Sequence, residues 1–511
     1  MLLFRSRLRP RHAPLDKHRS GRHRCTSLAA LASASIVVAA CTVGPDFKRP
    51  EPPTATTYTS EPVPEATAET AIAAGGSQRF VMGQELQRQW WTMFRSQALD
   101  QLIEAALRDS PTIAQGEATL RQAQEILAAE RGAQWPAINA GAQVSRQRES
   151  AAQLGLPRAE TFSLYGATVS VTYVFDLFGG VRRQLESLQA QVDSEQYQLE
   201  ATYLALTANL VTTAIREASL RAQLAATLEI EELQRKQLSV VERRFTLGAV
   251  ARSDVLAQRT VLAQTHAGIP PLQRQLALAR NQLAIFAGRF PGDAGLAEFD
   301  LEHLELPLDL PVSVPSALAR QRPDILAAEA LLHSASAQIG VATADLYPKL
   351  TLSGGVGVEA FMPDKLFTSN AFGWSIGAGL TAPLFNGGQL QARRRAAIAA
   401  YDGAAAAYRQ TVLIAFGSVA DALRALDADA RALQAQVDAQ TQARASYELA
   451  DKQFSAGAIS YLSLLDAQTR LQQTRIAVVQ TQADRYADTV ALFTALGGGW
   501  WNDHAQAASK Q

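Results

Sequence analysis

The chain has 511 residues, of which 48 are Lys or Arg and 48 are Asp or Glu, so its formal net charge is zero. This length would accommodate several ordinary domains. The charge is uneven, because residues 1–25 carry eight basic residues and one acidic residue. Removal of residues 1–40 would leave 40 basic and 47 acidic residues. A mildly acidic chain of this kind argues against a nucleic-acid partner.

The first 40 residues are typical of an export signal. A basic stretch precedes an apolar run, residues 28–40, which is too short to span a bilayer as a helix and fits a signal-peptide core. The run ends in small residues directly before Cys41, a pattern that resembles a bacterial lipobox. We therefore predict that 1–40 is a lipoprotein signal peptide and that Cys41 is acylated. The alternative is an ordinary signal peptide followed by an incidental cysteine.

Residues 41–89 are predicted to form a lipidated tether and an equatorial segment. The stretch 44–74 is rich in Pro, Thr and Glu. Cys41 would be the only cysteine after cleavage, so a disulfide within the chain is impossible. Acyl chains anchor a protein by burying CH₂ groups in lipid, and stable anchoring takes more than one chain. Thr42, which follows the cysteine, resembles the sorting pattern for the outer membrane.

The rest of the sequence contains one unit twice. The pair Ser110-Pro111 returns 212 residues later as Arg322-Pro323. The stretch 177–180 returns after 208 residues, and the stretch 244–250 returns after 209. Three markers in one order and at nearly one offset indicate a duplicated unit of about 200 residues.

This duplication divides the mature chain. The predicted segments are a first repeat, an inter-repeat equatorial linker, a second repeat and a C-terminal tail. Their boundaries are 90–290, 291–312, 313–500 and 501–511 respectively.

Two proline-free windows predict very long helices. No proline lies between Pro157 and Pro270 or after Pro383, and an interior proline would break a helix. A helix over residues 180–244 would measure about 100 Å at about 1.5 Å per residue. Apolar residues in the second window alternate at spacings of four and three, as in a coiled-coil seam. They are Val412, Phe416, Val419, Leu423, Leu426, Ala430, Leu433 and Val437. A coiled-coil scaffold would show the same pattern.

Four segments alternate between apolar residues and small or polar ones, as strands with two different faces do. They are residues 138–145, 168–175, 350–358 and 374–381. Each is close to the 9 to 11 residues that a tilted membrane strand needs. A half-buried sheet of an ordinary domain would alternate in the same way, so that alternative stays open.

Membrane strands would require several copies of the chain. After the signal we find no stretch of about 20 apolar residues, so we expect no transmembrane helix. Strands in lipid must close into a barrel, because open sheet edges are not tolerated there. A barrel needs at least about eight strands, and each chain offers four. Two copies would give eight and three would give twelve, and physical argument alone does not choose between them.

The sequence lacks the residue patterns of an enzyme or a metal site. None of the histidines after residue 40 belongs to an HExxH motif or a Cys/His cluster. No GxxxxGK[ST] loop is present, so the chain is not expected to drive transport itself. We predict no enzymatic activity, no cofactor and no metal.

Several motifs occur in a fixed order along the mature sequence, at 41–50, 90–91, 176–179, 383–388, 464–468 and 496–500. In these the chain resembles the outer-membrane efflux factors of the TolC/NodT/OprM type. The resemblance implies an α+β, mostly α fold. It also implies a homotrimer, with a twelve-strand outer-membrane β-barrel and a long periplasmic barrel of coiled-coil helices. The N-terminal segment, the linker and the tail would form a belt around that tunnel.

The resemblance also implies a function. The protein would be a lipid-anchored channel in the outer membrane of a Gram-negative bacterium, extending into the periplasm. It would serve as the exit duct of a tripartite pump and export drugs or other small molecules by passive conduction. Its partners would be a periplasmic adaptor (membrane fusion) protein, an inner-membrane RND-type transporter and outer-membrane lipid. The alternatives are a duct for type I protein secretion and a non-conducting periplasmic coiled-coil scaffold.

The resemblance assigns a periplasmic gate. Leu462 and Asp466 match the family's apolar and acidic gate rings, and Asp254 matches the acidic partner in the first repeat. Three symmetry-related carboxylates around a narrow pore would raise each other's pKa and attract cations. In an alternative view, Asp466 is a solvated surface residue and Leu462 is part of the packed core.

Opening of the gate is expected to be iris-like. The paired helices would move apart at two hinge glycines, Gly248 and Gly457. The chain departs from the TolC pattern at Phe454, where a tyrosine forms part of the lock, and at Ile459, where TolC has a basic residue. A lock built on those two side chains is therefore not expected here.

Overall fold

The computed structural model describes residues 42–150, 157–293 and 295–502. The predicted signal peptide and Cys41 lie outside the described residues. The described chain is mostly helical, and its internal contacts define two units, each drawn from both repeats. Among the described residues, the strand unit comprises those within 42–46, 131–185 and 337–397. The helical unit comprises the described residues within 47–130, 186–336 and 398–502.

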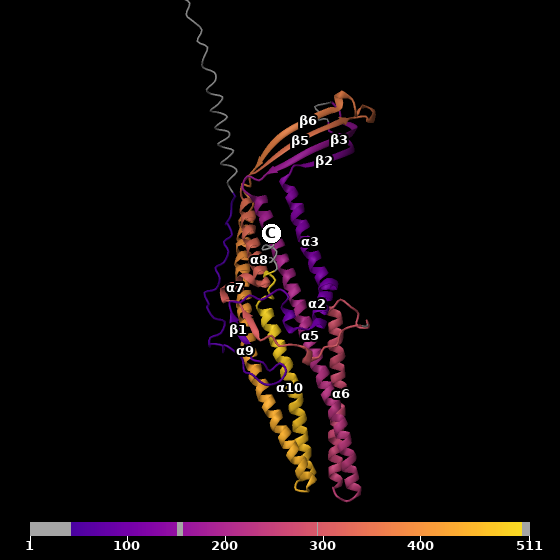
Figure 1. The fold of residues 1–511 in the computed structure, drawn as a ribbon. Coiled ribbons are helices and arrows are strands. Elements are labelled where there is room, and N and C mark those ends of the chain that lie inside the picture. The colour runs from indigo at the N-terminus through magenta and orange to yellow at the C-terminus, as the bar shows by residue number, and fades with distance from the viewer. Residues whose placement is uncertain (1–41, 151–156, 294, 503–511) are drawn as a thin grey trace, which may run out of the picture. The chain divides into compact units, whose positions relative to one another are not determined.

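The predicted duplication is confirmed by the order and lengths of the elements (Figure 1). The long helices α5 and α9 have 67 residues each, and α6 and α10 have 35 each. The first copy contains α3 (Pro111–Arg131), β2 (Ala137–Glu149), β3 (Glu160–Phe175), α5 (Gly180–Thr246) and α6 (Arg252–Phe286). The second copy contains α8 (Pro323–Ala344), β5 (Lys349–Ala360), β6 (Phe372–Thr381), α9 (Gln389–Ser455) and α10 (Tyr461–Ala495).

The four predicted strands form one antiparallel sheet in the order β2-β3-β5-β6 (Figure 1). Its register aligns the apolar positions of all four strands on one face, because side chains alternate with a period of two. One row contains Ile138, Val171, Gly354 and Ile376. The exposed fraction is 70% for Ile138 and 83% for Ile376, so this apolar face is uncovered. Within the described chain, β2 and β6 each have a neighbour on one side only.

The helical unit contains two hairpins, α5–α6 and α9–α10, and a core around a tryptophan pair. Trp90 and Trp91 start a short 3-10 helix, η1 (Trp90–Phe94), and both are buried. Trp90 packs against Phe493 of α10 at a ring distance of 5.6 Å. Most residues of the predicted α9 seam are also buried, namely Val412, Val419, Leu423, Leu426, Ala430 and Leu433. The heptad-like spacing therefore marked the packed face of α9 correctly.

Two segments depart from the sequence expectations. Helix α6 continues through Pro270-Pro271, beyond the proline-free window, and both prolines lie on its exposed side. Helix α8 is long and apolar enough, by length and composition, to cross a membrane, although no such stretch was expected. Half of its apolar window is buried inside the chain, as in the core helix of a folded domain, so we assign no membrane span to it.

The N-terminal segment and the inter-repeat linker meet in a small parallel sheet. Strand β1 (Arg79–Met82) pairs with β4 (Asp309–Val312). Arg485 of α10 is completely buried and holds the N-terminal segment by donating to the Ala74 carbonyl at 2.6 Å and to Gln78 Oε1 at 3.0 Å. A buried guanidinium needs such acceptors, because desolvation without partners is costly. The two short helices α2 (Gln97–Asp109) and α7 (Pro315–Gln321) complete this region of the helical unit.

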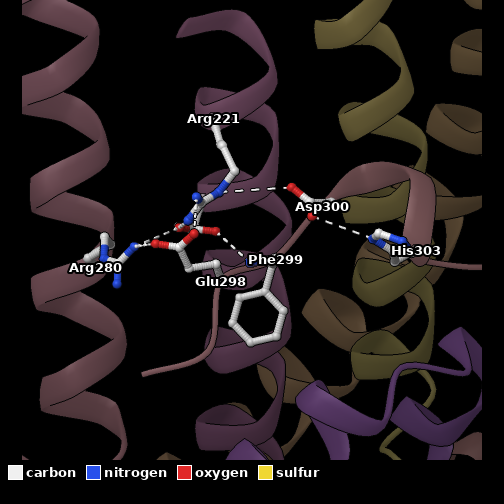
Figure 2. A network of polar contacts seen from close by, with 7 residues as sticks. Arg221, Arg280, Glu298, Phe299, Asp300 and His303 are labelled. Atoms are coloured by element: carbon white, nitrogen blue, oxygen red, sulfur yellow. Dashed lines mark hydrogen bonds and ion pairs between the residues drawn. The ribbon is translucent and has the colours of Figure 1, made fainter. Parts of the chain in front are cut away.

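A polar network fixes the linker to the first hairpin (Figure 2). Arg221 of α5 contacts Glu217 at 2.5 Å and Glu298 of the linker at 2.6 Å. Arg280 of α6 contacts Glu298 at 2.8 Å, and the Phe299 backbone N–H donates to Glu217 at 3.1 Å. Glu217 is completely buried, so these donors offset the cost of removing its charge from water.

Candidate functional site

Each hairpin turns at one of the two predicted hinge glycines. Gly248 has a φ of 74° and Gly457 a φ of 73°, a left-handed conformation that is costly for other residues. The backbone N–H of Ala249 donates to the Arg244 carbonyl at 2.9 Å, and the equivalent bond in the second hairpin is 2.8 Å. These are the bonds of a Schellman cap. The glycines therefore end α5 and α9, and their role as hinges stays a prediction.

The helices that follow the turns begin with different caps. In the first hairpin, Asp254 accepts a hydrogen bond from the Ala251 backbone N–H at 3.1 Å. In the second, Ser460 accepts one from the Ser463 backbone N–H at 3.3 Å. A carboxylate in the first turn also opposes the positive end of the helix dipole. Asp254, which the family resemblance assigned to the gate, thus has a local structural task at the start of α6.

Leu462 and Asp466 lie one turn apart on the exposed side of α10. Leu462 is 64% exposed, so it is not part of the packed core of the chain. The Asp466 side chain is 61% exposed and forms an ion pair with Arg470 at 2.9 Å. Arg470 was missed by the sequence analysis, although its spacing of four residues from Asp466 is typical of a helix ion pair. Both side chains are exposed, and their assignment to a gate stays a prediction.

A buried tyrosine connects the two hairpins beside these residues. The Tyr461 hydroxyl donates to Gln258 Oε1 of α6, and both side chains are buried. Burial raises the pKa of Tyr461, and the negative charge of Asp254 raises it further. The phenol therefore stays protonated and able to donate. Neither residue was predicted from the sequence. Only Tyr461 had a recognisable signal, because it is an aromatic residue directly before Leu462.

An apolar cluster surrounds this hydrogen bond. Its buried members are Val241, Val255, Ala450, Tyr461, Leu464, Leu465 and Ala467. Phe454 and Ile459, the two positions that depart from the TolC pattern, pack against the same cluster. The Phe454 ring lies 5.4 Å from the Tyr461 ring, and the guanidinium of Arg244 lies 4.8 Å from the Phe454 ring. Apolar and cation–π contacts therefore hold the two hairpins together at these positions.

The family of the chain follows from comparison with known proteins. The family model described as outer membrane efflux protein matches residues 102–289 and 314–498. These two stretches correspond to the two repeats. The chain therefore belongs to the outer membrane efflux protein family and is an outer-membrane protein.

Individual relatives agree with this assignment. The chain is 33% identical over 422 residues to the pyoverdine export outer membrane protein OpmQ of Pseudomonas putida, covering 81% of this chain and 89% of OpmQ. It is 29% identical over 487 residues to the toluene efflux pump outer membrane protein TtgC of Pseudomonas putida, covering 94% and 97%.

A solved structure extends the similarity to the fold. The structure of the outer-membrane channel OprN superimposes with a TM-score of 0.80 at 30% identity and covers 90% of this chain and 100% of that one. The expected mostly helical, TolC-like architecture is confirmed.

Proposed function

We propose that this protein is the exit duct of a tripartite efflux pump and conducts small organic molecules passively. One observation carries the proposal: a four-strand sheet with an exposed apolar face, whose two outer strands each lack a partner on one side within the described chain. In lipid such edges must be closed. Three copies would contribute twelve strands to one barrel, within the range of known membrane barrels. A soluble scaffold would have no use for this apolar face.

The proposed cargo is a small organic molecule. The name of OpmQ states pyoverdine export, and the name of TtgC states toluene efflux. These names favour small-molecule efflux over protein secretion for this chain. Because the sequence has no nucleotide-binding loop, the energy would come from an inner-membrane RND-type transporter, joined to the duct by a periplasmic adaptor. We propose no catalytic role for the chain.

The proposed gate is the hairpin tip, with Leu462 and Asp466 directed into the pore. Opening would separate the hairpins, which requires loss of the hydrogen bond from Tyr461 to Gln258 and exposure of part of the apolar cluster. Full exposure of one large apolar side chain costs about 1.5–3 kcal/mol. Contacts with the adaptor would have to offset this cost, so the isolated duct would rest closed.

The proposed lipid anchor is Cys41. The segment that follows it is held within the strand unit, where the Val43 backbone N–H donates to the Phe178 carbonyl at 3.1 Å and Asp46 pairs with Arg183 at 2.6 Å. Phe178 lies shortly after Phe175, the last residue of β3. An acyl chain on Cys41 would therefore start close to the end of a proposed membrane strand.

A charge placed on either face of β6 tests the proposal. Ile376 lies on the apolar face and Ser375 on the opposite one. An arginine facing lipid at the midplane costs about 2–4 kcal/mol. We expect Ile376→Arg to reduce the amount of protein folded in the outer membrane strongly, and Ser375→Arg to reduce it little. Equal behaviour of the two variants would contradict a lipid-facing sheet and would favour the scaffold.

A further inference from the structure

A cavity of about 230 Å³ lies between α5, α9 and α10 of the helical unit. Its lining includes the aliphatic side chains Leu233 and Leu471 and the aromatic ring of Tyr447. Small-molecule sites combine such an apolar wall with a few well-placed polar groups.

The charged side chains that line the cavity are all basic. They are Lys236 of α5, Arg444 of α9 and Arg475 of α10. Arg475 is paired with Glu229 at 2.6 Å and Lys236 with Glu232 at 3.5 Å. Within the described chain, Arg444 has neither an ion-pair partner nor a hydrogen-bond acceptor. The cavity therefore presents one guanidinium whose five donors are not engaged by the protein.

A buried carboxamide lines the same cavity. Gln468 of α10 is only 7% exposed. Its Oε1 atom is buried and has no hydrogen-bond partner among the described residues. Buried polar atoms are nearly always hydrogen-bonded, so an unpartnered one asks for an explanation. Rotation of the amide about its last bond presents either its donor or its acceptor to an occupant of the cavity.

We propose that this cavity binds a small organic carboxylate. Arg444 would hold the carboxylate through paired N–H donors, a geometry that a guanidinium favours. Gln468 would turn its Nε2 group toward the cavity and donate a hydrogen bond to the carboxylate, which only accepts. Leu233 and Leu471 would contact the apolar body of the ligand. This binding does not require that the protein conduct molecules, so it stands or fails separately from the proposed transport function.

Such a ligand would connect the two hairpins. Helix α5 belongs to the first hairpin, whereas α9 and α10 form the second, and all three line the cavity. A ligand that contacts all three favours the arrangement in which they lie together. The bound carboxylate would therefore stabilise the closed tip.

Titration calorimetry on the detergent-extracted full-length protein tests the site, with benzoate and hexanoate as probes and benzamide as the uncharged analogue of benzoate. We expect saturable binding of at least one carboxylate and about tenfold weaker binding of benzamide, because the charge-assisted bonds are lost. Arg444→Gln should weaken carboxylate binding by about the same factor. Arg409→Gln removes another exposed arginine of α9 and should leave it unchanged.

The second variant, Gln468→Leu, removes the carboxamide and should also weaken binding, while the folded protein keeps or gains thermal stability because a buried unpartnered group is gone. Three results would overturn the proposal. The first is that neither carboxylate binds in the millimolar range. The second is that benzamide binds as tightly as benzoate, and the third is that Arg444→Gln binds the carboxylates as tightly as the unchanged protein.

Discussion

The two helical hairpins share one backbone and differ in the side chains at their tips. Their helices have equal lengths, and both turn at a left-handed glycine. At the 209-residue offset of these helices, Leu462 and Asp466 of the second hairpin correspond to Ser253 and Ala257 of the first. The duplicated scaffold is thus present twice, whereas Leu462 and Asp466 have no equivalent side chains in the first hairpin.

The first hairpin instead supplies the groups that hold the second. Gln258 accepts the hydrogen bond from Tyr461, Arg244 lies over Phe454, and Asp254 caps the start of α6. The comparison suggests a division of roles in which one hairpin exposes the gate and the other restrains it. Substitutions in the gate residues, in the contacts that restrain them and in the turns that both hairpins share test this division.

The largest effect is expected from removal of the gate side chains. Leu462→Ala combined with Asp466→Ala should raise single-channel conductance in planar bilayers several-fold, because the narrowest ring loses both its bulk and its charge. The matched control is Leu449→Ala with Asp451→Ala, an exposed leucine and aspartate of α9. If the conductance equals that of the control, Leu462 and Asp466 do not form the gate. The assignment of the fold would not be affected.

Loss of the restraint should have the next largest effect. Tyr461→Phe leaves Gln258 buried without its donor, at a cost of about 1–3 kcal/mol to the closed tip. Openings in bilayer recordings should become more frequent. Tyr401→Phe serves as the control, because the Tyr401 hydroxyl makes no hydrogen bond within the described chain. An opening frequency equal to that of the control would show that Tyr461 does not restrain the tip.

The shared turns should respond alike in both hairpins. Gly457→Ala and Gly248→Ala force a left-handed alanine, which costs about 1–2 kcal/mol each, and both should lower the apparent thermal midpoint measured by circular dichroism. Gly417 lies inside α9 with open space around it, so Gly417→Ala should raise the midpoint by the equivalent of about 0.5–1 kcal/mol. An unchanged thermal midpoint in Gly248→Ala and Gly457→Ala would contradict the assignment of these glycines as helix caps.

Two aspartates in the middle of the second hairpin, Asp429 and Asp488, should make the thermal stability of the protein depend on pH. Burial, aided by the nearby carboxyl group of Asp488, raises the pKa of Asp429 to about 7; the first hairpin has Leu220 and Ala279 at these positions. A raised acid pKa stabilises the fold at low pH, and this contribution is lost as pH rises through about 7. Asp429→Asn should therefore raise the thermal midpoint at about pH 8 by the equivalent of about 1 kcal/mol more than it does at about pH 5. An equal shift at both values would contradict the titration.

The smallest effect is expected at Asp254, where two substitutions distinguish its role as a helix cap from its predicted role in the gate. Asp254→Asn keeps a hydrogen-bond acceptor for the Ala251 N–H, whereas Asp254→Ala removes it at a cost of about 0.5–1 kcal/mol. If Asp254 is a cap only, Asn should leave conductance and thermal midpoint unchanged and Ala should lower the midpoint. A change of conductance or cation selectivity in Asp254→Asn would return this residue to the gate.

The elements of the fold could be predicted from local signals in the sequence. Period-two alternation gave the four strands, and proline-free windows gave α5 and α9. The contacts between hairpins could not be predicted, because Tyr461 and Gln258 lie 203 residues apart and nothing local pairs them. The same holds for Arg485, whose partners lie more than 400 residues away. For Asp254, no cap could be recognised in the sequence, because Ala251 at the N-cap has no side-chain acceptor. The family resemblance directed attention to the gate instead.

A channel requires that other copies of the chain close the edges of the four-strand sheet. The most direct measurement is the mass of the protein extracted from outer membranes in detergent, determined by light scattering and corrected for bound detergent. We predict three chains per particle, which would bring twelve strands together. A single chain per particle would leave β2 and β6 without partners in lipid and would contradict the channel.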